Sequence, residues 1–478
     1  FNKMKRYIII LTVILSLASF TSCKKMLTEK MHSSLSPDNF YKTEADAEAA
    51  LNGVFSQLQY QNYYQRTIYL IADLSADIFQ PNNASSDRVQ LYTGTYTATN
   101  GQLYAWWSNI YTLIKNANDV ITYVPDIDMD DTKKNNILGN AHFLRGMAYF
   151  DLVRSYGDVP LVLHNGGDQN LFPSRTSSDS VYSQVISDLQ FAEANCLPAD
   201  RIPGNEIGRV SSEAASGMLA RVYLQRAGTG FAVSTDNQSA LDECNKIIQY
   251  SAGHPDVLTL VPNYADIFDV SKKNGPECIF SIEFGDPPNN NNITNLMFDP
   301  EAYGGYASFL PLASFYNSFD ALDKRKAVDA GTVVDGITYI SKYHDPGVAP
   351  GGFGRTNFIV IRYADILLMQ SEAMNNINPA DINKFGGINA VRTRAGLGTK
   401  LLDFSNTPTA ADFVDALVNE RLWELCLEGH RRWDLIRLKK FRQIKAAQGF
   451  NLDDNHVLLP IPQDERDVNK NLTQNPGY

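Results

Sequence analysis

Apolar positions along most of the chain recur every three or four residues, which is the spacing of one face of an α-helix. Near the C-terminal end this apolar stripe is made of Val414, Leu417, Val418, Leu422, Leu425 and Cys426. The pattern predicts a mainly α-helical protein in which helix follows helix. A helix is also expected to begin at Thr43, because Thr43 and Asp46 have the spacing of a capping box.

Small residues inside the predicted helices favour close helix pairs. They include Gly146 and Ala148, Ala215 and Ala220, and Ala364 and Ala373. Pairs separated by short polar turns are typical of a tetratricopeptide-like repeat array, although the period here is irregular and the full repeat consensus is absent. Strands should be few and short, and the β-rich run 332–343 predicts a minor hairpin.

Two long segments, 77–103 and 285–311, interrupt the helical rhythm and are expected to be irregular loops. Both are rich in Asn, Gly, Pro and Ser and contain several aromatic residues. Loops of this length in compact domains are usually functional or disordered, and embedded aromatic rings favour order. A sugar has apolar ring faces and a rim of hydroxyls, so a site for it needs flat aromatic surfaces beside polar groups that donate and accept hydrogen bonds. Both segments contain that mixture.

Six residues in or next to these segments are therefore candidate ligand-binding residues. Trp106 follows the first loop directly and Asn109 lies one helical turn later, Tyr303 and Tyr306 flank a Gly-Gly pair, and the first loop adds the charged residues Asp77 and Arg88. The other three tryptophans, Trp107, Trp423 and Trp433, are expected in the core. For any single ring, the favoured interpretation is a hydrophobic plug that fastens its loop to the helices, while some of the rings are expected to line a ligand face.

The first residues have the features of an export signal. Lys5 and Arg6 precede the apolar run Tyr7–Phe20, which is short for a membrane span, and small residues then lead to Cys23. This predicts a signal peptide at 1–22 and lipid attachment at Cys23, even though Phe20 stands where Leu is usual. Residues 23–42 would then be a polar tether. The predicted location is the outer membrane, lipid-anchored and exposed at the cell surface.

Composition fits a large exported globular protein. The chain has 478 residues, 44% of them hydrophobic, and a formal charge of −11 that becomes more negative when the signal is removed. This charge argues against nucleic acid or anionic lipid as the main partner, and favours an uncharged or cationic ligand. Apart from Cys23, the cysteines are scattered without metal-ligand spacing, so they are interpreted mainly as buried thiols, with a disulfide left open. No metal and no cofactor is predicted.

Sequence patterns of enzymes are missing. The chain has no GxGxxG, P-loop, GxSxG or HExxH pattern, and its seven histidines are scattered. The acidic run 126–131 begins like a calcium loop, but Asp131 and Ile137 stand where Gly and Glu are needed, so a solvated turn is expected. A glycoside hydrolase needs only two placed carboxylates, which sequence alone does not exclude. Binding without catalysis is the prediction.

The C-terminal segment 419–441, NERLWELCLEGHRRWDLIRLKKF, followed by LLPIPQDERDVNKNLTQNPGY, resembles the signature of the SusD/RagB family. NFIVIRYADILLMQSEAMN at 357–375 and INAVRTRAGL at 388–397 are similar to the helices that precede this signature, and helices of the N-terminal half match in order. Read as chemistry, the signature is a structural helix in which Glu420, Glu424 and Glu428 share a face and Glu428 pairs with Arg431 or Arg432. The resemblance implies a SusD-like helical domain at 43–478, with an N-terminal half at about 43–230 and a C-terminal half at about 275–478.

The resemblance also implies a function. Family members of this kind are surface lipoproteins that bind oligosaccharide and deliver it to a SusC-like TonB-dependent transporter, acting as a lid over that outer-membrane barrel. Two alternatives remain open: peptide binding, as on the RagB side of the family, and a helical scaffold without a small ligand.

Overall fold

The computed structural model describes residues 40–82, 84–165, 171–285 and 292–478. Lys42–Tyr478 form one compact unit. The chain is mainly helical (56%) with a few short strands, as predicted. The predicted signal peptide at 1–22 and the lipidation site Cys23 lie outside the described residues.

Helices follow one another along the chain. Their bounds are α3 Glu44–Leu58, α4 Thr67–Tyr69, α5 Ser86–Thr93, α6 Gly101–Tyr123, α7 Asp131–Tyr156, α8 Ser178–Asn195, α9 Ser212–Ala227, α10 Asp236–Gly253, α11 Thr294–Phe298, α12 Ala313–Ser318, α13 Arg325–Asp329, α14 Tyr363–Ile377, α15 Phe385–Arg394, α16 Ala410–Leu425, α17 Arg431–Arg437, α18 Phe441–Ala447 and α19 Gln463–Val468. Two π-helical turns, at Gln61–Gln65 and Leu70–Leu74, flank α4.

Strands form three small antiparallel pairs among the described residues. Their bounds are β1 Phe79–Pro81, β2 Cys278–Ile282, β3 Phe309–Pro311, β4 Thr332–Val334, β5 Ile337–Tyr339 and β6 Phe358–Arg362. β1 pairs with β3, β2 with β6, and β4 with β5. The β4–β5 pair confirms the hairpin predicted at 332–343.

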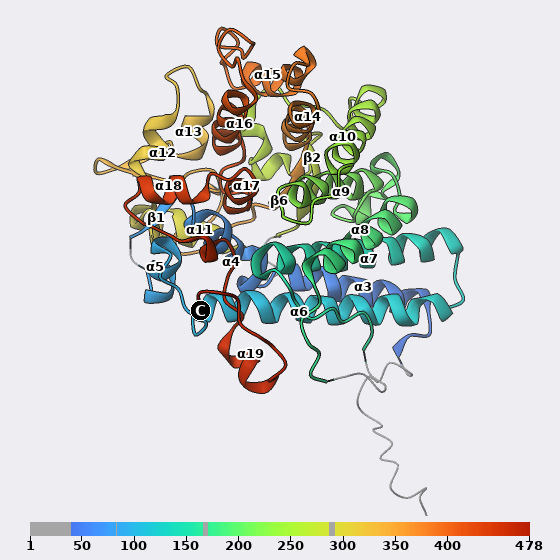
Figure 1. Cartoon of the computed structure of the whole chain (residues 1–478). Coiled ribbons are helices and arrows are strands. Elements are labelled where there is room, and N and C mark those ends of the chain that lie inside the picture. Colours follow the sequence, from blue (N-terminus) through green and yellow to red (C-terminus); the bar gives the residue numbers. More distant parts are fainter. Residues whose placement is uncertain (1–39, 83, 166–170, 286–291) are drawn as a thin grey trace, which may run out of the picture. The chain divides into compact units, whose positions relative to one another are not determined.

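Neighbouring helices pack as a succession (Figure 1). α3 and α7 both lie against α6, and α7, α8, α9, α10 and α14 then pack one against the next, with α15 and α16 beside α14. At Gly146 on α7, an added Cβ would lie 3.2 Å from the Leu189 side chain on α8, which shows why a small residue is needed where these two helices meet. The predicted role of small residues in close helix pairs is thus observed at α7 and α8.

The start of the described helical array also follows the sequence. Thr43 caps α3: its Oγ1 accepts from the Asp46 backbone N–H at 3.3 Å, while Asp46 Oδ2 accepts from the Thr43 N–H at 2.8 Å. This is the predicted capping box. The acidic run 126–131 likewise ends as a helix start, with Asp130 capping α7.

Candidate functional site

The two long segments predicted as loops meet through a strand pair. Phe79–Pro81 of the first segment pairs with Phe309–Pro311 of the second, and Asn82 extends this contact by donating from its backbone N to Ser308 O at 2.9 Å and from its side chain to Ala307 O at 2.9 Å. Neither segment is wholly irregular, since α5 lies in the first and α11 in the second. The prediction of long irregular loops is therefore only partly right, because short elements form where the two segments support each other.

A hollow of about 250 Å³ lies beside this junction, between segments 295–305 and 344–352. Both segments approach closely: at Gly304, where φ is +83°, a Cβ would lie 2.2 Å from the backbone N of Gly351. Pockets that enclose drug-sized ligands are roughly 300–1,000 Å³. This smaller hollow suits one end or one branch of a longer molecule.

Polar groups in the hollow are rich in hydrogen-bond acceptors. His344 Nδ1 lies 2.9 Å from Asp299 Oδ2, and burial raises the pKa of Asp299 although His344 opposes the shift. Asn295 is only 6% exposed, and its Oδ1 has no hydrogen-bond partner among the described residues. Tyr303 lies next to His344, with ring centroids 5.4 Å apart. A ligand with several hydroxyl donors would complement these groups.

Two of the six predicted site residues are prominent on the surface here. Tyr303 is 45% exposed and Tyr306 is 61% exposed. Tyr306 is held by its backbone, whose N donates to Leu296 O at 2.7 Å, so its ring is free to meet solvent while its position is fixed. We call the surface formed by Asn82, Arg88, Tyr303 and Tyr306, together with the adjoining hollow, the loop face.

Trp106 is a core residue, contrary to its prediction as a binding platform. Its side chain is fully buried (0% exposed) and its Nε1 donates to Ser155 Oγ at 3.3 Å. The apolar spacing of α6 carried this signal, because Leu103, Trp106 and Ile110 recur on one helical face and all three are buried. Trp423, which was expected in the core, is instead partly exposed and donates to Ser318 Oγ at 2.9 Å.

Asp77 and Asn109 are also occupied by the fold. Both carboxylate oxygens of Asp77 accept from Arg431, at 2.7 and 2.8 Å. Asn109 donates to Ala105 O at 2.9 Å and accepts from Gln57 at 3.0 Å. Their polar groups are thus used in joining helices, and only long-range contacts that sequence does not display reveal this. Arg88 differs, because it lies on α5 at the loop face with its guanidinium 5.6 Å from the Phe309 ring centroid.

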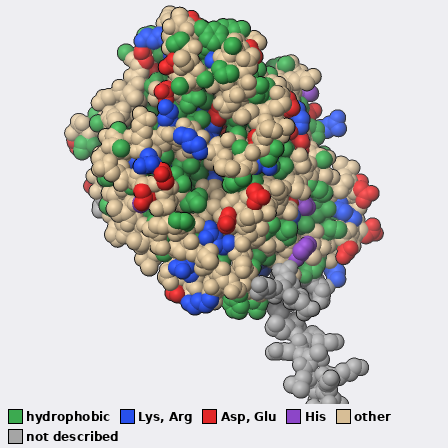
Figure 2. Space-filling view, in the orientation of Figure 1, with side chains coloured by type: hydrophobic (Ala, Val, Ile, Leu, Met, Phe, Trp, Pro, Cys, Tyr) green, Lys and Arg blue, Asp and Glu red, His purple; other side chains and the backbone are tan. Residues whose placement is uncertain are grey.

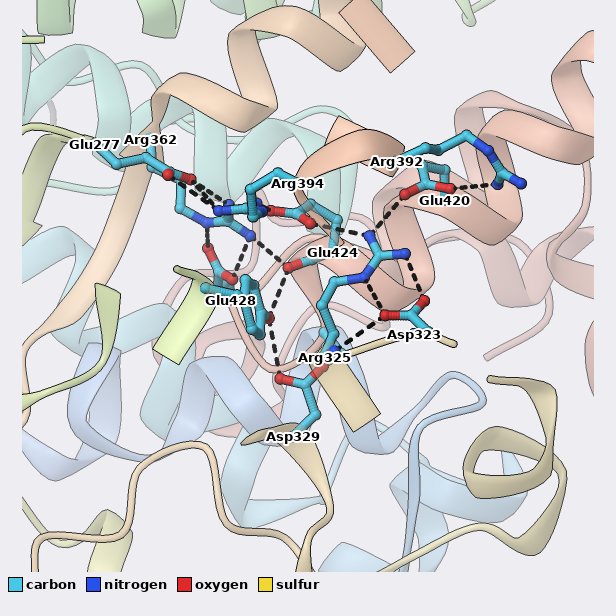
Figure 3. Close-up of polar contacts among 12 residues, drawn as sticks. Glu277, Asp323, Arg325, Asp329, Arg362, Arg392, Arg394, Glu420, Glu424 and Glu428 are labelled. Atoms are coloured by element: carbon cyan, nitrogen blue, oxygen red, sulfur yellow. Dashed lines mark hydrogen bonds and ion pairs between the residues drawn. The ribbon is translucent and has the colours of Figure 1, made fainter. Parts of the chain in front are cut away.

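The C-terminal signature segment supplies a buried ionic network (Figure 3). Glu424 on α16 forms ion pairs with Arg325, Arg362 and Arg394, which come from α13, β6 and α15. These four side chains are 0–3% exposed. Burial favours a raised pKa for Glu424, but the three guanidinium groups outweigh it and hold the pKa well below its usual range. The network ties four elements together and presents no surface to a ligand.

Glu428 belongs to the same network, but not through the predicted partners. It pairs with Arg362 and Lys342, each at 2.8 Å. The expected pairing with Arg431 or Arg432 required a continuous helix, and α16 ends at Leu425. The helical spacing that would bring those side chains together is lost there.

A second, larger hollow of about 650 Å³ lies between α3, α7 and the 203–209 segment. Its two cationic groups are already paired, Lys133 with Glu44 at 2.5 Å and Arg209 with Glu48 at 2.8 Å. Its aromatic ring, Phe55, is covered by the Arg209 guanidinium at 5.0 Å. The larger hollow thus presents no uncovered aromatic ring among its described lining residues, whereas the loop face presents two exposed ones.

Other features limit what the surface can bind. On the face drawn in Figure 2, Lys and Arg are interspersed with Asp and Glu, so no large patch of one sign is seen there. In the described part of the chain, no group of three or more His, Cys, Asp or Glu is placed to hold a metal ion, and no helix is long and apolar enough to cross a membrane. The four described cysteines, Cys196, Cys244, Cys278 and Cys426, are free thiols.

Two family models match different parts of the chain. One, described as the SusD family, matches residues 330–478, and another, described as "Starch-binding associating with outer membrane", matches residues 29–224. With full-length relatives and solved structures in agreement, these matches decide the family. The chain belongs to the SusD/RagB family. It is a SusD-like protein of a glycan-binding, outer-membrane-associated family. SusD family proteins are non-catalytic binding proteins, so the family also confirms that this chain is not an enzyme.

SusD-like relatives align with nearly the whole chain. SusD-like protein P2 of Formosa agariphila is 29% identical, over 99% of this chain and 100% of the relative. The structure of a SusD superfamily protein from Bacteroides vulgatus has a TM-score of 0.78 at 23% identity and covers 92% of this chain and 100% of its own. A structure described as a laminarin-binding SusD-like protein has a TM-score of 0.76 at 25% identity and covers 92% and 100%. These similarities confirm the SusD-like fold.

Proposed function

We propose that this SusD-like protein captures oligosaccharide on the loop face and delivers it to a SusC-like TonB-dependent transporter in the outer membrane. The observation that carries the proposal is the pair of exposed rings, Tyr303 and Tyr306, fixed by backbone contacts beside a polar hollow. Aromatic faces stack on the apolar faces of sugars, and the hollow supplies acceptors for their hydroxyls. Membership of a family described as starch-binding, and likeness to a laminarin-binding protein, support glycan as the ligand.

The proposed anchoring and transfer use other parts of the chain. Lipid on Cys23 would hold the protein at the membrane, and a tether at 23–42 would keep it near one transporter, which raises its local concentration there. Stacked helices offer an extended rigid surface for a barrel rim, with an expected interface of roughly 2,000 Å² or more, as in permanent complexes. Mild detergent extraction followed by affinity purification should co-isolate a large outer-membrane barrel in near-equal amount. Recovery of this protein alone would count against the transfer step.

Calorimetry with a panel of glycans and peptides tests the binding step. On a shallow aromatic face, we expect a modest free energy for a cognate glycan, roughly −4 to −6 kcal/mol. Tyr306→Ala should remove about 1–3 kcal/mol of it, because one or two aromatic rings usually dominate such sites. Phe404→Ala, which truncates a ring that is 37% exposed between α15 and α16, is the matched control and should leave affinity unchanged.

The controls separate the alternatives. Thermal stability of Tyr306→Ala should be nearly unchanged, since the ring is 61% exposed. Binding of peptides with no binding of glycans would favour the RagB-like alternative, and binding of neither would favour a scaffold. Glycan recovered after incubation should be intact, and new reducing ends would contradict a binding-only function.

A further inference from the structure

Two half-buried arginines, Arg88 of the loop face and the nearby Arg66, lack the carboxylate partners that many arginines of this protein have. Arg145, for example, binds Asp188 through Nη2 at 2.6 Å, and Arg325 binds Asp323 through Nη2 at 2.7 Å. Within residues 40–82, 84–165, 171–285 and 292–478, the Arg88 side chain has no hydrogen-bond or ion-pair partner and contacts only the Phe309 ring.

Arg66 is held only by neutral groups. It donates from Nη1 to Gln61 Oε1 at 3.3 Å and from Nη2 to Asn62 Oδ1 at 3.1 Å. Its backbone stands between the two π-helical turns, and such turns often occur at functional sites. The Nε atoms of Arg66 and Arg88 are both buried without an acceptor among the described residues.

These two charges lie near each other and are only partly hydrated. Burial lowers the pKa of Arg66, and the nearby charge of Arg88 lowers it further. Burial also lowers the pKa of Arg88. Partly desolvated like charges without counter-ions are unfavourable, so an anion placed between them would be bound favourably.

Nearby carboxylates do not supply that anion. Asp77 is bound on both oxygens by Arg431. Asp87, the residue next to Arg88, accepts from the backbone N–H of Gly101 at 3.0 Å. The two arginines therefore remain without a negative partner within the described fold, although the whole chain carries a formal charge of −11.

Arg88 belongs to the loop face already proposed to bind glycan, and Arg66 lies near it. Arg88 contacts Phe309 of β3, which pairs with Pro81 of β1, and Tyr306 precedes that strand by three residues. Building on the proposed function, we propose that the glycan bound here is anionic, and that Arg66 and Arg88 hold its carboxylate or sulfate groups while Tyr306 stacks on a sugar ring. This replaces the expectation of an uncharged or cationic ligand, because local unpaired guanidinium groups decide the contact more than net charge does.

Matched pairs of glycans test this inference. Binding is measured by calorimetry for polygalacturonate oligosaccharides against their methyl esters, and for carrageenan oligosaccharides against agarose oligosaccharides, with laminarin as a further neutral probe. The first pair reports on carboxylate and the second on sulfate. For at least one pair, the anionic member should bind about tenfold or more tightly, as expected for charge-assisted hydrogen bonds. That preference should shrink as salt is raised.

Variants assign the preference to the two arginines. Arg88→Gln and Arg66→Gln should each remove most of it, and Arg88→Lys should keep part. Arg201→Gln, which changes an exposed arginine between α8 and α9, is the control and should change nothing. Unchanged thermal midpoints would show that the fold is intact. Equal binding of anionic and neutral members overturns the inference while leaving glycan binding established. Failure to bind any of the five glycans overturns this inference and counts against the proposed function as well.

Discussion

Removing the negative charge at the centre of the buried network should strongly destabilise the protein. Glu424 is the residue to change, because it contacts Arg325, Arg362 and Arg394 and its side chain is 0% exposed. Glu424→Gln keeps the shape and one acceptor but removes the charge. Breaking a buried ion pair from one side costs about 3–5 kcal/mol, because the remaining charge stays buried without compensation.

The network itself sets where in that range the cost falls. Without Glu424, Arg325 keeps Asp323 and Glu420, and Arg362 keeps Glu277 and Glu428. Arg394 keeps only Glu277, at 3.1 Å, so its charge loses the largest share of its compensation. We therefore expect about 3 kcal/mol, near the lower end of the range. The free energy of unfolding of a typical protein is roughly 5–15 kcal/mol, so this loss is a large fraction of it.

Urea denaturation followed by far-ultraviolet circular dichroism measures the change as a lower midpoint with little change in slope. Asp415→Asn is the matched control on the same helix, because Asp415 pairs with Lys440 at the surface and is 59% exposed. An exposed pair contributes about 0–1 kcal/mol, so its midpoint should barely move. If Glu424→Gln shifted stability by no more than Asp415→Asn, the network would not be the element that joins these helices and strands.

Three further predictions concern the anchor, the core and pH. Cys23→Ala should move the protein from the outer-membrane fraction to the soluble fraction without changing its helicity, and unchanged retention with no lipid mass on the N-terminal peptide would exclude the anchor. Trp106→Ala should lower the free energy of unfolding by about 3–5 kcal/mol, measured by urea denaturation, because it empties a fully buried site; an unchanged midpoint would contradict its place in the core. Burial raises the pKa of Asp329 from 3.8 to about 6, with Lys342 opposing. The Asp329 carboxyl therefore loses its proton at lower pH in the unfolded chain than in the folded protein, and the free energy of unfolding falls as pH rises from about 4 to 6. Asp329→Asn should remove that fall, gaining stability relative to wild type between pH 4 and pH 7, whereas a constant difference across this range would refute the shift.

Local periodicity was enough to predict much of the fold. The helices, the capping box at Thr43 and the hairpin near 332–343 follow from spacing along the chain. Periodicity also indicates the burial of Trp106, which lies on the same face of α6 as Leu103 and Ile110. The position of Trp106 directly after a long segment favoured exposure, but the periodicity of α6 decides its burial.

Long-range contacts explain why the rest of the site was not predicted. The pairing of β1 with β3 joins segments more than two hundred residues apart, and Arg431 binds Asp77 across 354 positions. No local pattern reports such contacts, because they depend on how the helices stack. Arg66 was missed for the same reason: its lack of a carboxylate partner is visible only once its surroundings are known. The exposure of Tyr303 and Tyr306 agrees with the sequence, because Gly and aromatic residues in a long segment already favour an exposed, ordered loop.

The most direct test of glycan capture on the loop face is a crystal structure of the protein with the oligosaccharide that binds best in calorimetry. We expect a sugar ring against Tyr306, a neighbouring unit reaching the hollow of Asn295, Asp299 and Tyr303, and no cleavage of the chain. Glycan bound instead in the larger hollow between α3 and α7, with the loop face unchanged, would contradict the account.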